Sequence, residues 1–256
     1  MCNKKKENIS ELEFKDLFQL DITKSELHIY GKNIVCITNK RGYPMALEKG
    51  IHDIVLDARK GFIPLWDMNV TLRWRFNESL NHFKEPEKAK VYIRTLFNEA
   101  LSRWGEAKPV NFKEVSSLWD FEISLNHTDQ CYQDNLCTMG KSFFPNGGQN
   151  KFVLFPKLFS KLLSYDEKVA IMTHELGHIF GLRHFFAEID EKEYKSIIYG
   201  SHQKFSIMNY GKESILTDND IFDLKELYSK VWSNELKQLN GTLIKLVSPF
   251  HHYANV

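Results

Sequence analysis

The sequence predicts an α+β fold, in which a twisted mixed sheet carries two main helices. Three features of the chain predict this class. Residues 68–76 (MNVTLRWRF) alternate apolar and polar side chains, which is typical of a half-buried strand. Residues 88–104 place apolar side chains at helical spacing, and a second long helix begins at Ser164. Together these patterns favour helices packed against a sheet.

The remaining elements follow in chain order. Further strands are predicted at residues 110–115, 121–125, 138–144 and 151–155. Ser164 and Glu167 have the spacing of a capping box, so a helix begins there, and it should end at Gly181. Thr217 and Asp220 repeat this signature at the start of another amphipathic helix. The segment after this helix shows no clear pattern.

Composition limits the function classes. The 256 residues contain 34 Lys and Arg against 33 Asp and Glu, a formal net charge of +1. This balance excludes nucleic-acid binding by bulk charge. Hydrophobic residues make up 43%, enough for a sizeable core, and no apolar run approaches the roughly 18 residues of a transmembrane helix. We expect neither a nucleic-acid partner nor a transmembrane segment, and the oligomeric state stays open.

The strongest motif is HELGHIFGLRH, which begins at His174. His174 and His178 are four residues apart, so a helix projects them from one face with a spacing that suits two Zn²⁺ ligands. Gly181 allows the positive-φ turn that ends the helix and brings His184 back as a third ligand. Three protein ligands leave a fourth position for water, as in a catalytic zinc site. Glu175 lies beside the first histidine, where it can take a proton from that water.

These residues resemble the extended zinc motif of the metzincin metallopeptidases. Downstream, Ser206–Gly211 (SIMNYG) resembles their Met-turn, and its sequence is most similar to that of the astacins. The resemblance implies a metzincin-like catalytic domain whose cleft lies between an upper and a smaller lower subdomain. It implies that Met208 forms a hydrophobic floor under the histidines. It also implies that Tyr210 can ligate the resting metal and then swing away to stabilise the oxyanion.

A weaker resemblance to matrixins and astacins extends over residues 66–232, and it divides the chain into three parts. Residues 66–232 are expected to form the peptidase domain. Residues 1–65 are expected to be an accessory or pro-like segment, which ends near the basic stretch Arg59–Gly61. Residues 233–256 form a tail outside the shared pattern.

The chain departs from these families at named positions. Phe185 replaces the glutamate that follows the third histidine in astacins, so activation by a salt bridge to the mature N-terminus is in doubt. His127 begins a stretch similar to the matrixin structural-zinc site, but residues 138–155 contain no histidine, so one zinc is expected. Neither the matrixin cysteine-switch motif nor the astacin aspartate-switch motif occurs in residues 1–65. Cys36 could latch the zinc there, although a buried apolar role is the more common one for a cysteine.

The other cysteines leave two questions open. Cys131 and Cys137 flank a short polar loop, where they form either a local disulfide or two free thiols. The start of the chain has no apolar signal-peptide core, which fits a cytoplasmic product. Cys2 also fits the lipid-bearing first residue of a bacterial lipoprotein, so a secreted or lipid-anchored protein is the second interpretation of the compartment.

The expected function is therefore that of a zinc-dependent endopeptidase. Its protein or peptide substrate should lie extended in the cleft, against the edge strand near residues 138–143, where main-chain hydrogen bonds hold it. The preference for particular substrate side chains should come from a pocket beside the Met-turn, lined by residues 209–216. The alternative is a non-catalytic or self-inhibited zinc-binding module of the same fold. The non-catalytic form is disfavoured by Glu175, because no structural role needs a carboxylate at that position.

Overall fold

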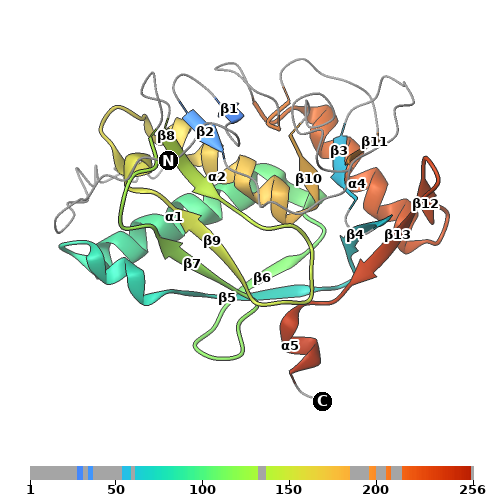
Figure 1. Cartoon of the computed structure of the whole chain (residues 1–256), viewed down its shortest axis with the longest axis horizontal. Helices are drawn as coiled ribbons and strands as arrows, with labels where there is room; N and C mark the ends of the chain where they lie inside the picture. The colour runs from blue at the N-terminus through green and yellow to red at the C-terminus, as the bar shows by residue number, and fades with distance from the viewer. Residues whose placement is uncertain are drawn as a thin grey trace, which may run out of the picture.

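The computed structural model describes residues 28–30, 34–36, 54–58, 61–131, 137–184, 196–199, 206–208 and 215–254. It contains a large mixed sheet, two smaller sheets and three long helices in these ranges, drawn in Figure 1. The predicted α+β class, with its twisted mixed sheet and two main helices, is confirmed. Within the described part of the chain, every helix is too short or too polar to cross a bilayer.

The large sheet has the strand order β1-β2-β8-β9-β7-β5-β6. Its strands are β1 (His28–Tyr30), β2 (Ile34–Cys36), β5 (Thr71–Phe76), β6 (Asn111–Glu114), β7 (Phe121–Leu125), β8 (Cys137–Lys141) and β9 (Asn150–Leu154). The four neighbouring strands β9, β7, β5 and β6 run parallel, whereas β8 runs antiparallel to β9. The predicted strands from residue 68 to residue 155 all appear, with ends shifted by a few residues.

One edge of this sheet is formed by the N-terminal part of the chain. β2 pairs in parallel with β8, and the register places Cys36 opposite Gly140. β1 then pairs antiparallel with β2 and is the outermost strand. The side of β8 that faces away from β9 is therefore occupied by a segment from residues 1–65. The expectation that the strand near residues 138–143 is an edge strand is wrong, because β2 pairs with it.

Helix α1 (Pro86–Trp104) covers the sheet with an apolar face. Proline at the first helical position suits a helix start, because its missing N–H has no intrahelical partner there. Phe97 lies at the centre of this face, where its ring contacts Trp74, Phe121 and Phe152 from three strands. Helix α2 (Tyr165–Ile179) packs beside α1, and the Trp104 indole donates a hydrogen bond to the carbonyl of Thr173 (2.9 Å).

The remaining elements come from several parts of the chain. They are β3 (Ile54–Asp57), β4 (Phe62–Trp66), β10 (Leu182–Arg183), β11 (Ser196–Tyr199), α4 (Asp218–Trp232), β12 (Gln238–Leu239), β13 (Thr242–Val247) and α5 (Phe250–Tyr253), together with short 3-10 turns at Glu78–His82, Gly105–Ala107 and Pro156–Phe159. β10 and β11 both pair with β3. β13 pairs in parallel with β4, so the tail after residue 232 is joined to a strand from the other end of the chain.

Both predicted capping boxes are present. The Ser164 hydroxyl accepts from the amide of Glu167, and the Glu167 carboxylate accepts from the amide of Ser164. Thr217 and Asp220 make the same reciprocal pair at the start of α4. Each box satisfies two amides that the first turn of a helix leaves without intrahelical partners. The starts of both helices were therefore correctly predicted.

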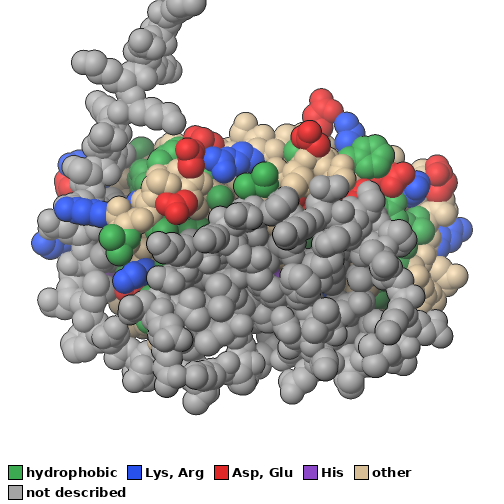
Figure 2. Space-filling view, turned by 90° about the horizontal axis from the view of Figure 1, so that it is seen from above, with side chains coloured by type: hydrophobic (Ala, Val, Ile, Leu, Met, Phe, Trp, Pro, Cys, Tyr) green, Lys and Arg blue, Asp and Glu red, His purple; other side chains and the backbone are tan. Residues whose placement is uncertain are grey.

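The face seen in Figure 2 carries mixed charges. On its described part, basic and acidic side chains alternate around the rim, with apolar side chains between them. This pattern agrees with the near-zero net charge of the sequence.

Candidate metal centre

The centre begins on α2, which is buried along its last three turns. His174, Glu175 and His178 each retain only 1% of their exposed area. The imidazole rings of His174 and His178 lie 5.0 Å apart between centroids, one turn from each other. The helix therefore presents two imidazoles and a carboxylate inside the protein rather than to solvent.

The chain then turns back at Gly181. Helix α2 ends at Ile179, and the amide of Gly181 donates to the carbonyl of His178 (2.9 Å). Gly181 has a φ of 96°, which is strained for any residue with a β-carbon. The turn leads into β10 and places His184 beside the first two histidines, as the sequence predicted.

The three histidines form one cluster. His174, His178 and His184 are all buried, and their potential ligand atoms lie within 4.8 Å of one another. The Nε2 atoms of His174 and His184 are 3.2 Å apart. Among the described residues, these three histidines form a group that could hold a metal ion. Three imidazole nitrogens suit zinc.

Backbone carbonyls fix two of the rings. Nδ1 of His174 donates to the carbonyl of Ile207 (2.7 Å), and Nδ1 of His178 donates to the carbonyl of Leu182 (2.8 Å). A carbonyl only accepts, so Nδ1 carries the proton and the Nε2 lone pair is left for a ligand bond. Burial lowers the pKa of His174 to about 4, and the hydrogen bond to Ile207 opposes this shift. His174 is therefore neutral at physiological pH, which is the form that binds a metal.

Glu175 lies against the large sheet. A β-carbon at Gly140 in β8 would come within 2.8 Å of Cγ of Glu175 and within 3.0 Å of its Oε1. Only a glycine at position 140 leaves this room. The sequence interpretation missed Gly140, although a glycine inside a strand is itself a sign of close approach.

Met208 lies beneath the helix that carries the histidines. It is buried, and a β-carbon at Gly177 would come within 2.5 Å of its sulfur atom. Gly177 is the residue directly before His178, so the thioether packs against α2 one residue away from an expected ligand. The role of Met208 as a hydrophobic floor stays a prediction. Ser206, two residues earlier, donates its hydroxyl hydrogen to Asp220 (2.6 Å) and holds this segment against α4.

Other predicted residues have different outcomes. Tyr210 and Phe185 lie outside the described residues, as does most of 209–216. For Cys36 the backbone register with Gly140 is described, but its side chain is not. His127 lies in the loop after β7, with its ring stacked on His82 at 4.5 Å between centroids.

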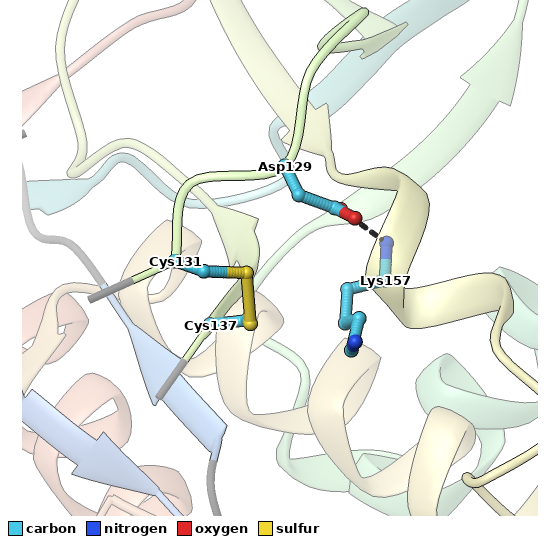
Figure 3. The surroundings of a disulfide bond; sticks show 4 residues. All are labelled: Asp129, Cys131, Cys137 and Lys157. Carbon is cyan, nitrogen blue, oxygen red and sulfur yellow. Dashed lines mark hydrogen bonds between the residues drawn. A yellow bond between two sulfur atoms is a disulfide. The ribbon is translucent and has the colours of Figure 1, made fainter. Parts of the chain in front are cut away.

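The pair Cys131–Cys137 is a disulfide, so the first of the two alternatives holds (Figure 3). It joins the loop after β7 to the start of β8. Beside it, the Asp129 carboxylate accepts a hydrogen bond from the amide of Lys157 (2.7 Å). Burial raises the pKa of Asp129, and this hydrogen bond opposes the shift.

Comparison with known proteins shows the family of this chain. Residues 65–229 match the matrixins, a peptidase family, and they make up more than half of the chain. This chain belongs to the matrixin family. Matrixins are metzincins, so the expected superfamily and the peptidase type of fold are confirmed. The closer similarity to astacins, which was expected from the sequence of Ser206–Gly211, is not supported.

Two individual proteins are similar to this matrixin. Metalloendoproteinase 1-MMP of Arabidopsis thaliana is 24% identical over 148 residues, which cover 53% of this chain and 38% of the relative. The chain therefore spans less than half the length of that relative. The structure of myroilysin superposes with a TM-score of 0.46 at 14% identity, covering 68% of this chain and 98% of the other.

Proposed function

We propose that this matrixin is a zinc-dependent endopeptidase. The observation that carries the proposal is the cluster of three buried histidines, whose potential ligand atoms lie within 4.8 Å of one another. A carboxylate, Glu175, follows the first of these histidines on the same helix. The family match supports the same conclusion.

His174, His178 and His184 would hold one zinc ion through imidazole nitrogens. A zinc ion at this position supplies Lewis-acid chemistry, since it polarises a carbonyl and lowers the pKa of water. The carbonyls of Ile207 and Leu182 keep two of the rings in the ligating tautomer, so their lone pairs are directed before the metal arrives. Met208, which packs against Gly177, would support the helix from below in the role of a Met-turn methionine.

Glu175 would act as the general base. Its carboxylate would take the proton from the attacking water and then pass it to the leaving amine. Burial beside Gly140 restricts the positions that this carboxylate can take. Tyr210 would donate a hydrogen bond to the developing oxyanion, a role that rests on the family resemblance of Ser206–Gly211.

The test is cleavage of a mixed peptide library by the zinc-loaded chain, with Glu175→Gln as the matched control. Glutamine keeps the size of the side chain but accepts a proton poorly, so the variant should retain zinc and lose about 10²–10⁴-fold in hydrolysis. Activity in Glu175→Gln within about tenfold of the parent would remove Glu175 from the mechanism. A zinc-loaded parent that cleaves no peptide would favour the non-catalytic alternative.

A self-inhibited form is the second candidate, and one observation favours it. β2 occupies the edge of β8, which is the strand where an extended substrate is expected to bind. Each edge of a strand can pair with one neighbour only, because its amide and carbonyl groups are then satisfied. A peptide would therefore have to displace β2 before it could be held by this edge.

A further inference from the structure

The C-terminal end of α2 is held by two buried aromatic side chains. The indole of Trp66 in β4 donates to the carbonyl of Ile179 (2.6 Å). The hydroxyl of Tyr228 in α4 donates to the carbonyl of Phe180 (3.0 Å). The last carbonyls of a helix have no intrahelical partners and commonly bond to water. Here protein donors satisfy them in the interior, since Trp66 and Tyr228 are each 1% exposed.

Tyr228 contacts the chain at the turn between two of the expected ligands. Phe180 lies between His178 and the positive-φ turn at Gly181, after which the chain reaches His184. The Tyr228 hydroxyl also accepts from the amide of Trp66 (3.3 Å), so it joins β4 to this turn. Burial raises the pKa of Tyr228, and the hydroxyl therefore stays protonated as a donor.

The other end of α4 contacts the segment beside His174. The Asp220 carboxylate accepts from the hydroxyl of Ser206 (2.6 Å) and more weakly from the amide of Ile207 (3.4 Å). The carbonyl of Ile207 is the acceptor for Nδ1 of His174. Asp220 is therefore two hydrogen bonds away from the ring of His174. The same carboxylate caps α4 through Thr217, which ties the position of Ile207 to the start of the helix.

We propose that Asp220 and Tyr228 are positioning residues for the metal centre. One helix sets the orientation of His174 through Ile207 and the turn from His178 to His184 through Phe180. The proposal rests on the zinc-binding part of the proposed function. Ligands that are held in place before binding lose less conformational freedom when the metal arrives, which raises affinity. Without its hydroxyl partner the buried carbonyl of Phe180 would be unsatisfied, and the turn would relax.

The probe is zinc alone, with its dissociation constant measured by competition with a chelator. Tyr228→Phe and Asp220→Asn should each weaken binding by about 10–100-fold, the usual effect of losing a group that orients a ligand. Tyr199→Phe is the control for the first variant, because its hydroxyl bonds to Glu226 of the same helix without contacting the turn. Asp218→Asn is the control for the second, because it makes the same change at an exposed position in the first turn of α4 and leaves the bond from Ser206 to Asp220.

A nitrogen-15 NMR spectrum of the zinc-free protein supplies a second readout. The proton on Nδ1 of His174 should be protected from exchange in the parent and in Asp218→Asn, and exposed to exchange in Asp220→Asn. Ser206→Ala replaces Asp220→Asn if that variant does not fold, because it removes the shorter of the two hydrogen bonds from this segment to Asp220 and keeps the capping box. Unchanged zinc affinity in both positioning variants, or equal losses in variants and controls, would overturn the proposal. A folded parent that binds no zinc would instead refute the proposed function.

Discussion

Gly140 in β8 lies directly against Glu175 in α2. A β-carbon at position 140 would come within 2.8 Å of Cγ of Glu175, closer than such carbons approach one another in proteins. The strand and the helix are thus packed with no space between them at the proposed general base. The position of the carboxylate depends on the absence of a side chain on the neighbouring strand.

Gly140→Ala should displace Glu175 and lower kcat while leaving zinc bound. A shift of about 1 Å at a reacting group can cost about 10²-fold in rate. The three heavy atoms nearest to the added β-carbon all belong to Glu175 and none to a histidine, so the metal content should stay at the parent level. The measurement is steady-state hydrolysis of one cleaved peptide, together with zinc content by elemental analysis.

Gly148→Ala is the control for this variant, because Gly148 lies in the turn before β9 and its β-carbon would face Asn146. It should keep parental activity. If Gly140→Ala also hydrolyses the peptide at the parental rate, the contact with Glu175 has no role in catalysis.

His178→Ala should lose most of its zinc. The proposed site has three protein ligands, and two imidazoles bind zinc far more weakly than three. His127→Ala is a suitable control, since its ring stacks on His82 outside the cluster. Elemental analysis of dialysed protein gives the answer, and full occupancy in His178→Ala would show that the ligand assignment is wrong.

The elements near the site were largely predictable because local patterns specify them. Apolar spacing located α1, and two capping boxes located the starts of α2 and α4. The spacing of the histidines predicted that they would meet, since a helix and one glycine turn bring them together. These are short-range relationships, which a sequence shows directly.

Long-range relationships were not visible in the same way. The pairing of β13 with β4 joins residues that are far apart in the chain. The local sequence pattern of either strand does not predict which strand it pairs with. The bond from Tyr228 to Phe180 depends on how α4 packs against α2. Tyr228 lies in the amphipathic helix predicted after Thr217, but the sequence does not show the partner of its hydroxyl, because that partner is far away along the chain.

Tyr210→Phe should lower kcat more than it raises KM. If the hydroxyl donates to the oxyanion, it matters most in the transition state, and its loss typically costs about 10²–10³-fold. Zinc affinity should be nearly unchanged, because three histidines remain. Kinetics on one peptide at several concentrations separate the two parameters. An effect on KM alone would make Tyr210 a substrate-binding residue, and parental kinetics would leave it a structural one.

The last prediction concerns the strand that covers the sheet edge. Removal of residues 1–36 deletes β1 and β2 but keeps β3, whose Leu56 and Asp57 are fully buried and which pairs with the strand leading to His184. If β2 blocks the substrate edge of β8, its removal should raise kcat/KM. The gain should equal the inverse of the fraction of parent molecules in which the edge is open.

Cys36→Ala distinguishes two ways in which this segment could inhibit: binding of the zinc by the Cys36 thiol, and pairing of β2 with β8. The register places Cys36 opposite Gly140, the residue against Glu175, so its backbone lies at the proposed catalytic centre. If the thiol is the latch, Cys36→Ala should raise kcat/KM as much as the truncation does. If pairing of the strand is what blocks the edge, Cys36→Ala should remain as slow as the parent, whereas Val35→Pro should be activated, because proline removes an amide and disfavours strand geometry.

A truncated chain that keeps the melting temperature of the parent and is no more active would refute inhibition by this segment. A truncated chain that melts at a much lower temperature, together with an inactive but folded Val35→Pro, would show that β1 and β2 stabilise the sheet instead.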